Sequence, residues 1–151
     1  MDEIALRWSA FDELSGREVH DLLRLRMDVF VVEQACAFAE IDGKDIDALH
    51  LRQFSGETLI GCLRVLSPEG EPVRIGRIVT AKDFRSQGLG HEMLVEALRY
   101  VADRFAEREV VLSAQAQLQG FYAQHGFEPA SAPYDEDGIA HIDMKRPAPR
   151  H

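Results

Sequence analysis

The chain has 151 residues, 28% of them charged, and its 26 acidic side chains outnumber 17 basic ones to give a net charge of −9. A chain of this length folds as one domain and buries roughly two-thirds of the surface that it exposes when unfolded. The negative charge disfavours binding to nucleic acid or acidic membranes and mildly favours an amine-bearing partner. An anionic cofactor would therefore need a local site.

The cysteines and the lengths of the apolar segments indicate the cellular compartment. The two cysteines, Cys36 and Cys62, do not have the spacing of metal ligands. The first residues lack a basic-then-apolar signal, and no apolar run reaches the length that spans a membrane. We expect a cytoplasmic protein with both thiols free and no metal site.

The first elements are a short strand at residues 4–8 and a helix that begins at a capping box. In that box the hydroxyl of Ser15 is followed three residues later by the carboxylate of Glu18. The helix leads into an apolar run at residues 29–32 that ends at Glu33. One face of this helix is apolar: Val19, Leu22, Leu23, Met27 and Phe30.

An acidic loop follows, from Ala35 to about Asp47, and it carries Glu40, Asp42 and Asp45 as well. The spacing of these side chains does not match a calcium-binding EF-hand, and no closing glutamate follows. We expect a solvated acidic loop rather than a metal site. Its position next to Glu33 leaves a role in attracting the substrate open.

Three strands and a glycine-bearing turn come next. Residues 49–54 and 58–66 predict two strands joined by a hairpin at residues 55–57, and a third strand ends at Thr80. The turn Arg85-Ser86-Gln87-Gly88-Leu89-Gly90 then runs into a long helix.

The turn has the features of an anion-binding site. Gly88 and Gly90 let an anion approach the backbone, the N–H groups of the first helical turn point at it, and Arg85 adds a charged fork. The turn lacks the Gly-Lys-Ser/Thr of a P-loop and the three-glycine order of a dinucleotide fingerprint. Taken alone, it is also compatible with a purely structural helix cap.

The remaining elements complete an α/β (α+β) pattern. The long helix buries one face: Leu89, Met93, Leu94, Ala97, Leu98, Val101 and Phe105. A strand at 110–114, a short helix that stops at Gly126 and a strand at 139–146 follow. The pattern predicts a single mixed, mostly antiparallel sheet with helices on both faces, in a domain at 1–146 with a tail at 147–151.

Two motifs, taken together, resemble the GNAT superfamily of acyl-CoA-dependent N-acyltransferases. The first is Arg-x-x-Gly-x-Gly at residues 85–90, and the second is Tyr122 with Gly126-Phe127, beyond the intervening helix and strand. Segments 29–34, 42–43, 114–122 and 134–142 further resemble its ElaA-type branch. The resemblance spans nearly all of the chain before Pro147.

The resemblance implies a site for acetyl-CoA as co-substrate. In that superfamily the strand before the turn separates from its neighbour, and the pantetheine arm fills the gap. Ile78 would donate its N–H to the thioester carbonyl, and Val79 and Thr80 would pair with pantetheine. Gln115 stands where the family often has asparagine, and its amide would keep a similar contact. The pyrophosphate would be cradled by the amides of Arg85, Ser86, Gln87, Gly88, Leu89, Gly90 and His91.

The resemblance also suggests how the reaction is catalysed. Tyr122 would be the general acid that protonates the departing thiolate. Glu33 is a candidate for the general base, because burial beside the substrate loop would raise its pKa, or it is a solvated or capping glutamate. His50, His141 and a water relay are the alternatives, which the resemblance does not settle.

Other polar residues are open to two interpretations. Arg64, Arg77 and Gln117 would line the acceptor site, or the two arginines would form ion pairs on the sheet. Cys36 is expected to be a small buried thiol rather than a nucleophile that carries the acyl group.

The function implied by the resemblance is an N-acetyltransferase in which a primary amine attacks the thioester directly in a ternary complex. The acceptor would be a small molecule or a protein amine, and a homodimer is common in such folds. The alternatives are a non-catalytic acyl-CoA-binding sensor or partner module and a nucleotide-binding protein.

Overall fold

The computed structural model describes residues 3–36 and 39–148. These residues form eight strands and three α-helices, joined by shorter helical turns. The strands are β1 (Ile4–Ala10), β2 (Leu49–Ser55), β3 (Thr58–Leu66), β4 (Val73–Thr80), β5 (Val110–Gln115), β6 (Glu128–Pro129), β7 (Tyr134–Glu136) and β8 (Ile139–Arg146). The helices are α1 (Gly16–Arg26), α2 (Leu89–Arg104) and α3 (Gln119–Ala123). The shorter turns are η1 (Phe11–Glu13), the π-helical η2 (Met27–Glu33), η3 (Asp45–Asp47), η4 (Lys82–Phe84) and η5 (Ala116–Leu118).

Helix α1 begins at the predicted capping box. The Ser15 Oγ accepts a hydrogen bond from the Glu18 backbone N–H at 3.1 Å, and the Glu18 carboxylate accepts one from the Ser15 N–H at 2.9 Å. The two bonds satisfy donors that a helix start otherwise leaves without partners. The helix continues into η2, which carries Glu33 to the end of the helical segment.

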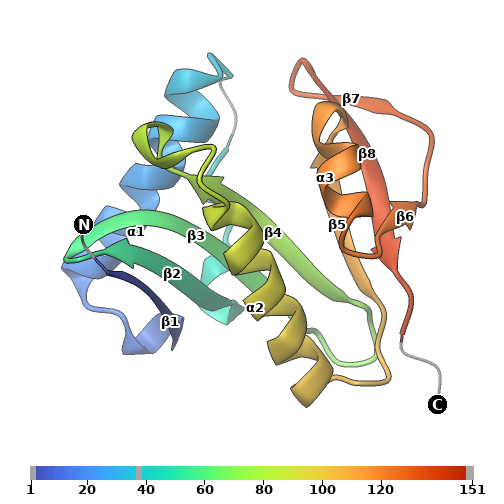
Figure 1. Cartoon of the computed structure of the whole chain (residues 1–151), viewed down its shortest axis with the longest axis horizontal. Coiled ribbons are helices and arrows are strands. Elements are labelled where there is room, and N and C mark those ends of the chain that lie inside the picture. Colours follow the sequence, from blue (N-terminus) through green and yellow to red (C-terminus); the bar gives the residue numbers. More distant parts are fainter. Residues whose placement is uncertain (1–2, 37–38, 149–151) are drawn as a thin grey trace.

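The strands form one mixed sheet in the order β1-β2-β3-β4-β5-β8-β6, with β7 paired to β8. Each pair from β1–β2 to β3–β4 is antiparallel, and β5 is parallel to β4. Within the described residues β4 and β5 pair only at Val73–Val110 and Arg74–Val111. Beyond these pairs the two strands diverge, as Figure 1 shows.

A bulge interrupts β4 where it runs beside the diverging strand. Cys62 pairs with Val79, and Arg64 pairs with Gly76, so that Arg77 and Ile78 both lie opposite the single residue between them on β3. Arg77 has a φ of 52°, in the left-handed region. Bulges of this kind redirect a strand and its side chains and occur often beside functional sites.

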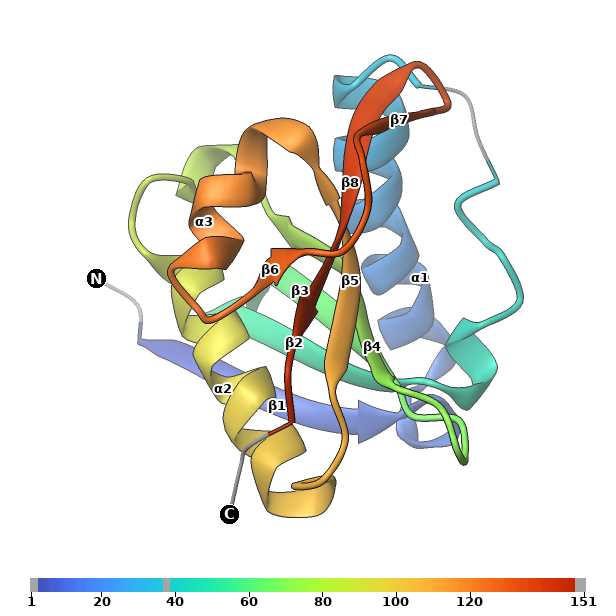
Figure 2. The same cartoon turned by 90° about the vertical axis from the view of Figure 1, so that its right-hand side faces the viewer.

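Helices cover both faces of the sheet, as predicted. Figure 2 shows α1 on one side of the sheet and α2 with α3 on the other. The larger buried cluster lies on the α2 side, where the predicted helix face contributes Met93, Leu94, Ala97 and Val101. The smaller cluster lies under α1 and includes Leu22, Val29 and Val79. None of the helices among the described residues is long and apolar enough to cross a membrane.

The sequence pattern missed two strands. One strand was expected after the short helix, but the structure has β6, β7 and β8 there. Strands β6 and β7 are two and three residues long, too short for an alternating pattern, and they form because β8 offers them a pairing edge. Of the predicted tail, residues 149–151 lie outside the described part of the chain.

Candidate active site

A cavity of about 1040 Å³ opens between the diverging strands β4 and β5. It is lined by η2, the bulged half of β4, the start of α2, the end of β5, α3 and the β7–β8 hairpin. Of the predicted site residues, Gln87, His50 and Gln117 are not part of the lining. The structure brings the others to this cavity: Glu33, Cys36, Arg64, Arg77, Ile78, Val79, Thr80, Arg85, Ser86, Gly88, Leu89, Gly90, His91, Gln115, Tyr122 and His141.

The glycine turn is built as an open cradle at one end of the cavity. Gly88 has a φ of 77° and forms the N-cap of α2, and no side chain caps the helix there. A Cβ added at Gly88 would meet nothing within 4 Å, so the turn presents main-chain groups to open space. The unpaired N–H groups of the first helical turn and the positive helix end favour an anion at this position. The cradle is therefore suited to bind an anion.

Arg85, which follows η4, is held in place by two partners. Its guanidinium donates two hydrogen bonds to the Glu33 carboxylate, at 2.6 and 2.9 Å, and one to the Thr80 carbonyl at 3.1 Å. The bidentate bond from Arg85 lowers the pKa of Glu33. The expectation that burial raises this pKa is wrong, because Glu33 lies at the end of η2 within reach of a guanidinium.

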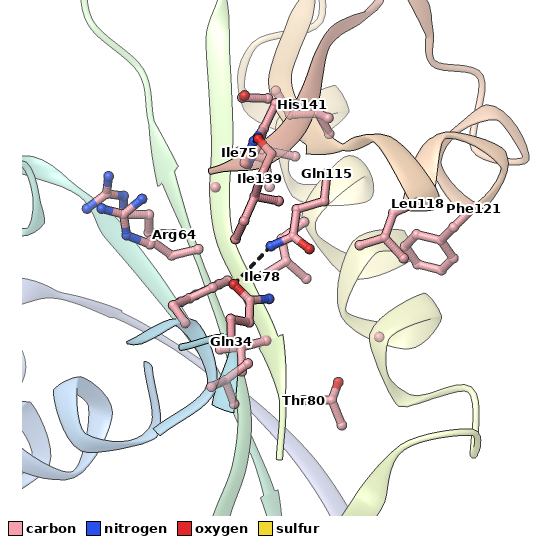
Figure 3. Close-up of a pocket in the computed structure, with 18 of the residues that line it drawn as sticks. Gln34, Arg64, Ile75, Ile78, Thr80, Gln115, Leu118, Phe121, Ile139 and His141 are labelled. Atoms are coloured by element: carbon pink, nitrogen blue, oxygen red, sulfur yellow. Dashed lines mark hydrogen bonds between the residues drawn. The ribbon is translucent and has the colours of Figure 1, made fainter. Parts of the chain in front are cut away.

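Two glutamines bridge the cavity. The Gln115 amide, at the end of β5, donates a hydrogen bond to the Gln34 side-chain oxygen at 3.2 Å. Figure 3 shows this bond crossing the space between η2 and β5. Gln117 donates to the Gln115 oxygen at 2.7 Å from outside the lining. Gln115 is thus already oriented toward the gap in which a pantetheine arm would lie.

Tyr122 is a buried phenol on α3. Its side chain is 6% exposed and packs edge-on against Phe121 and Phe127, with ring centroids 5.1 and 6.0 Å away. Burial raises its pKa to about 12, because the charged phenolate is poorly solvated there. The phenol therefore keeps its proton at neutral pH and can donate it to a group of matching basicity.

The acidic loop is not solvated as expected, because its carboxylates pair with buried arginines. Arg26 donates to Glu40 at 2.7 Å and to Asp45 at 2.7 Å, and all three residues are buried. These pairs compensate for the removal of the charges from water. The arginines come from α1 and the sheet, which the loop sequence alone does not reveal. The full network consists of Arg26, Arg64, Arg77, Glu40, Asp42 and Asp45.

Arg64 and Arg77 belong to this network, as one of their two interpretations predicted. Arg64 binds Asp42 at 2.6 Å, which lowers the pKa of that carboxyl group, and Arg77 binds Glu40 at 2.7 Å. Both arginines also line the cavity. Asp42, Arg64 and Arg77 are thus the members of the network that reach the cavity, and Figure 3 shows Arg64 at its edge.

The two candidate histidines differ in position. His50 is 1% exposed, its Nε2 lies 2.9 Å from the Asp45 carbonyl, and burial lowers its pKa. His50 therefore serves as a structural residue outside the cavity. His141 lies on β8 directly opposite Gln115 and lines the cavity.

Cys36 joins the two sides of the cavity. Its buried thiol donates a hydrogen bond to the Asp137 carbonyl, in the β7–β8 turn, at 3.1 Å. The thiol is thus a small buried group, in keeping with its expected role. Gln34, Glu136 and Asp137 lie in segments that resemble the ElaA-type branch, but the sequence did not single them out as site residues. Within the described residues, no three His, Cys, Asp or Glu side chains are grouped to hold a metal ion.

Most of the chain is similar to known proteins in sequence and in structure. Residues 19–147 match the acetyltransferase (GNAT) domain family. The chain is 38% identical to the protein ElaA of Escherichia coli over 138 residues, 89% of this chain and 90% of ElaA. The crystal structure of E. coli ElaA superposes with a TM-score of 0.90 at 36% identity, covering 95% of this chain and 99% of ElaA.

Two other solved structures extend the comparison. An acyl-CoA N-acyltransferase from Pseudomonas aeruginosa has a TM-score of 0.90 at 38% identity, covering 95% of this chain and 99% of its own. A GNAT family acetyltransferase from Elizabethkingia anophelis, with acetyl-CoA bound, has a TM-score of 0.70 at 16% identity, covering 97% and 99% of the two chains. The latter likeness concerns the fold alone.

Proposed function

The chain belongs to the GNAT acetyltransferase family, and we propose that it transfers the acetyl group of acetyl-CoA to a primary amine by direct attack in a ternary complex. The family is one of acyl-CoA N-acyltransferases. One observation carries the proposal: a single cavity between the diverging strands β4 and β5 is lined both by the glycine turn and by the buried phenol of Tyr122.

The residues that would hold acetyl-CoA follow from the geometry of this cavity. Within the described residues β4 pairs with β5 only at Val73 and Arg74. Val79 and Thr80 lie farther along β4 and line the cavity, where their main chain would meet the pantetheine amides. Gln115 would reach the arm from the opposite strand. The diphosphate would lie on the amides of residues 85–91, of which Gln87 is not part of the cavity lining.

The bulge in β4 supports a catalytic role for the Ile78 amide. The bulge turns the backbone at Arg77 and Ile78 out of the regular ladder with β3. A backbone N–H directed at the thioester oxygen stabilises the negative charge that develops there, and loss of such a donor costs about 3 kcal/mol in other enzymes. Tyr122 would then donate its proton to the coenzyme A sulfur as the carbon–sulfur bond breaks.

Acetyl as the transferred group and the cytoplasm as the compartment are parts of the same proposal. The match to an acetyltransferase domain family over residues 19–147 supports the acetyl group. The buried thiols of Cys36 and Cys62 are free, which suits a reducing compartment. The acceptor would be a small-molecule or protein amine, and a homodimer is compatible with the proposal.

The test is an acetylation assay with the wild-type protein and Tyr122→Phe. Free thiol release from acetyl-CoA would be measured with and without L-lysine, putrescine and phenethylamine, and coenzyme A binding would be measured by calorimetry. We expect amine-dependent turnover that falls by about 100-fold or more in Tyr122→Phe, with coenzyme A affinity nearly unchanged. Tyr100→Phe, on α2 against Trp8, is the matched control and should retain activity.

The same assay separates the proposal from its rival, a non-catalytic acyl-CoA-binding module. Tight coenzyme A binding without turnover on any amine would favour the module. Absence of coenzyme A binding would contradict both.

A further inference from the structure

We propose that His141 is the general base that takes the proton of the attacking amine, and that the Ile139 carbonyl and the Glu136 carboxylate position its ring. The inference rests on the proposed acetyl transfer. It names a residue for the step that the sequence left open between Glu33, His50, His141 and water.

The register of the sheet places His141 at the cavity. His141 on β8 pairs directly with Gln115 on β5, and paired residues of antiparallel strands point to the same face. Gln115 reaches from that face across the gap to Gln34. The side chain of His141 is 13% exposed and lines the same cavity, and Figure 3 shows it beside Ile139 on the wall that carries Gln115.

The hydrogen bond of His141 determines which ring nitrogen is available. Its Nδ1 lies 2.8 Å from the Ile139 carbonyl oxygen. A carbonyl oxygen accepts only, so Nδ1 carries the hydrogen and the neutral ring has its lone pair on Nε2. A nitrogen with a free lone pair is what a general base requires.

Neighbouring groups hold the ring in this orientation. The Tyr134 ring stacks on it with centroids 6.1 Å apart and planes 23° apart. The Tyr134 hydroxyl is in turn bonded to Ser113 and Asp143, each at 2.6 Å. Because Tyr134 is anchored to both β5 and β8, the imidazole lies against a fixed surface.

Glu136 faces the free nitrogen. Its carboxylate lies 3.6 Å from His141 Nε2 and is about half exposed. A carboxylate at that distance attracts an incoming ammonium and provides a counter-charge once Nε2 has taken the proton. Glu136 is therefore a positioning residue, since it acts through the imidazole and on the approach of the amine.

The other titratable groups around the cavity are less suitable as a base. Arg85 lowers the pKa of Glu33, and Arg64 lowers the pKa of Asp42, so both carboxylates are weak bases. Asp137 lies at the exposed hairpin turn beside Glu136. His91 lies in the first turn of α2, at the anion cradle, where its Nδ1 is 3.2 Å from His125 Nε2. His141 is thus the histidine on the acceptor side.

The step balances as follows. An incoming ammonium first loses one proton to solvent. The neutral acceptor nitrogen then forms a bond to the acyl carbon, and one of its remaining protons goes to His141 Nε2. The carbon–sulfur bond breaks with its electron pair going to sulfur, which takes the proton of Tyr122. Solvent then returns the proton from the imidazolium to the phenolate, so both residues regain their starting states.

The test uses His141→Asn, because the asparagine amide can still donate to the Ile139 carbonyl but cannot accept a proton at the position of Nε2. With acetyl-CoA and the most active of the amine probes above, we expect kcat/KM to fall by about 100-fold at neutral pH. The limb of the pH–rate profile that reports deprotonation of the general base should disappear. His20→Asn, at an exposed site on α1, should leave both unchanged.

Two further measurements distinguish a base from a merely structural residue. Nitrogen-15 NMR of the wild-type protein without acetyl-CoA should show the Nδ1–H tautomer at His141. Calorimetry should show coenzyme A affinity within about twofold of wild type for His141→Asn. Glu136→Gln should raise KM for a cationic amine by a few-fold while changing kcat less.

The outcomes separate the inference from the proposed function. If wild type acetylates the probe and His141→Asn keeps kcat/KM within about threefold with the same pH profile, His141 is not the base although the function stands. An Nε2–H tautomer would also overturn the inference. If wild type has no amine-dependent turnover, the proposed function fails, and the inference fails with it.

Discussion

The two ends of the cavity are built in different ways. The end proposed to bind the cofactor consists of main-chain groups, namely the edge of β4 and the amides of the turn that begins α2. The end proposed to bind the acceptor consists of charged side chains that come from the loop after η2, from β3 and from the β7–β8 hairpin. A main-chain site needs glycines at given positions in one segment, whereas a side-chain site needs partners from several segments. A sequence motif can therefore reveal the main-chain site but not the side-chain site.

Glu33 and Gln34 connect the two ends. These consecutive residues at the end of the helical segment bind Arg85 and Gln115, both of which are proposed to contact the cofactor. The end of the helical segment is thereby hydrogen-bonded to both proposed cofactor contacts, through Glu33 to Arg85 and through Gln34 to Gln115. A change at either residue should alter coenzyme A binding even though neither belongs to the glycine turn.

The largest effect should come from the buried charges beneath the acceptor end. Arg26→Met leaves Glu40 and Asp45 buried with their partner removed, which should lower the free energy of unfolding by about 3–5 kcal/mol. Urea unfolding followed by circular dichroism would measure it. Arg24→Met, on the exposed side of α1, should change the same quantity by less than about 0.5 kcal/mol. Equal effects of the two changes would show that the network does not stabilise the fold.

The next effect concerns the cofactor end. Gly88→Val places a branched side chain at a φ of 77° and fills the anion cradle, so coenzyme A affinity should fall by about tenfold or more. Gly70→Val is the matched control, because Gly70 has a φ of 78° and equally open surroundings in the loop before β4. Both variants should lose similar stability in thermal melts, and only Gly88→Val should lose affinity in calorimetry. A similar loss of affinity in both would assign the effect to strain rather than to the cradle.

A smaller effect is the pH dependence of the unfolding free energy that comes from the carboxylates of the proposed acceptor end. The pKa values of Asp42 and Asp45 are lowered in the folded state by their arginine partners. Stability from this source is complete above the unfolded pKa of about 4 and is lost as the pH falls below it. We expect unfolding free energy to drop by on the order of 1 kcal/mol between pH 5 and pH 3, and by less in Arg64→Met. Parallel pH curves for the two proteins would contradict this.

The smallest effect should be the change in coenzyme A affinity on substitution of Glu33, which pairs with Arg85. Glu33→Gln removes the charge that partly neutralises Arg85, so coenzyme A should bind a few-fold more tightly at low salt. Asp28→Asn, an exposed carboxylate on the same helical segment, is the control and should have no effect. If Glu33 were instead the general base, Glu33→Gln would lower kcat by about 100-fold. Calorimetry and steady-state kinetics on the same preparation decide between these outcomes.

The features that the sequence predicted depend on short stretches of chain. The Ser15–Glu18 box, the apolar face of α2 and the turn with Gly88 each involve residues that are neighbours along the sequence. The resemblance to acyl-CoA-dependent acyltransferases, which rests on the spacing of such motifs, is confirmed by the family match. Strands β6 and β7 were missed because their few residues are stabilised by β8 rather than by their own pattern.

The sequence by itself determined the glycine turn, the helix that follows it and the aromatic segment that carries Tyr122. These features follow from local backbone preferences and from the periodicity of apolar side chains. The tertiary structure alone decided the partners of the charged and polar groups. Examples are the pairing of Arg85 with Glu33, 52 residues apart, and the hydrogen bond of the Cys36 thiol to the Asp137 carbonyl, 101 residues apart. The physical reason is that ionisation and hydrogen bonding depend on distances of a few ångströms, which only the folding of remote segments around the diverging strands sets.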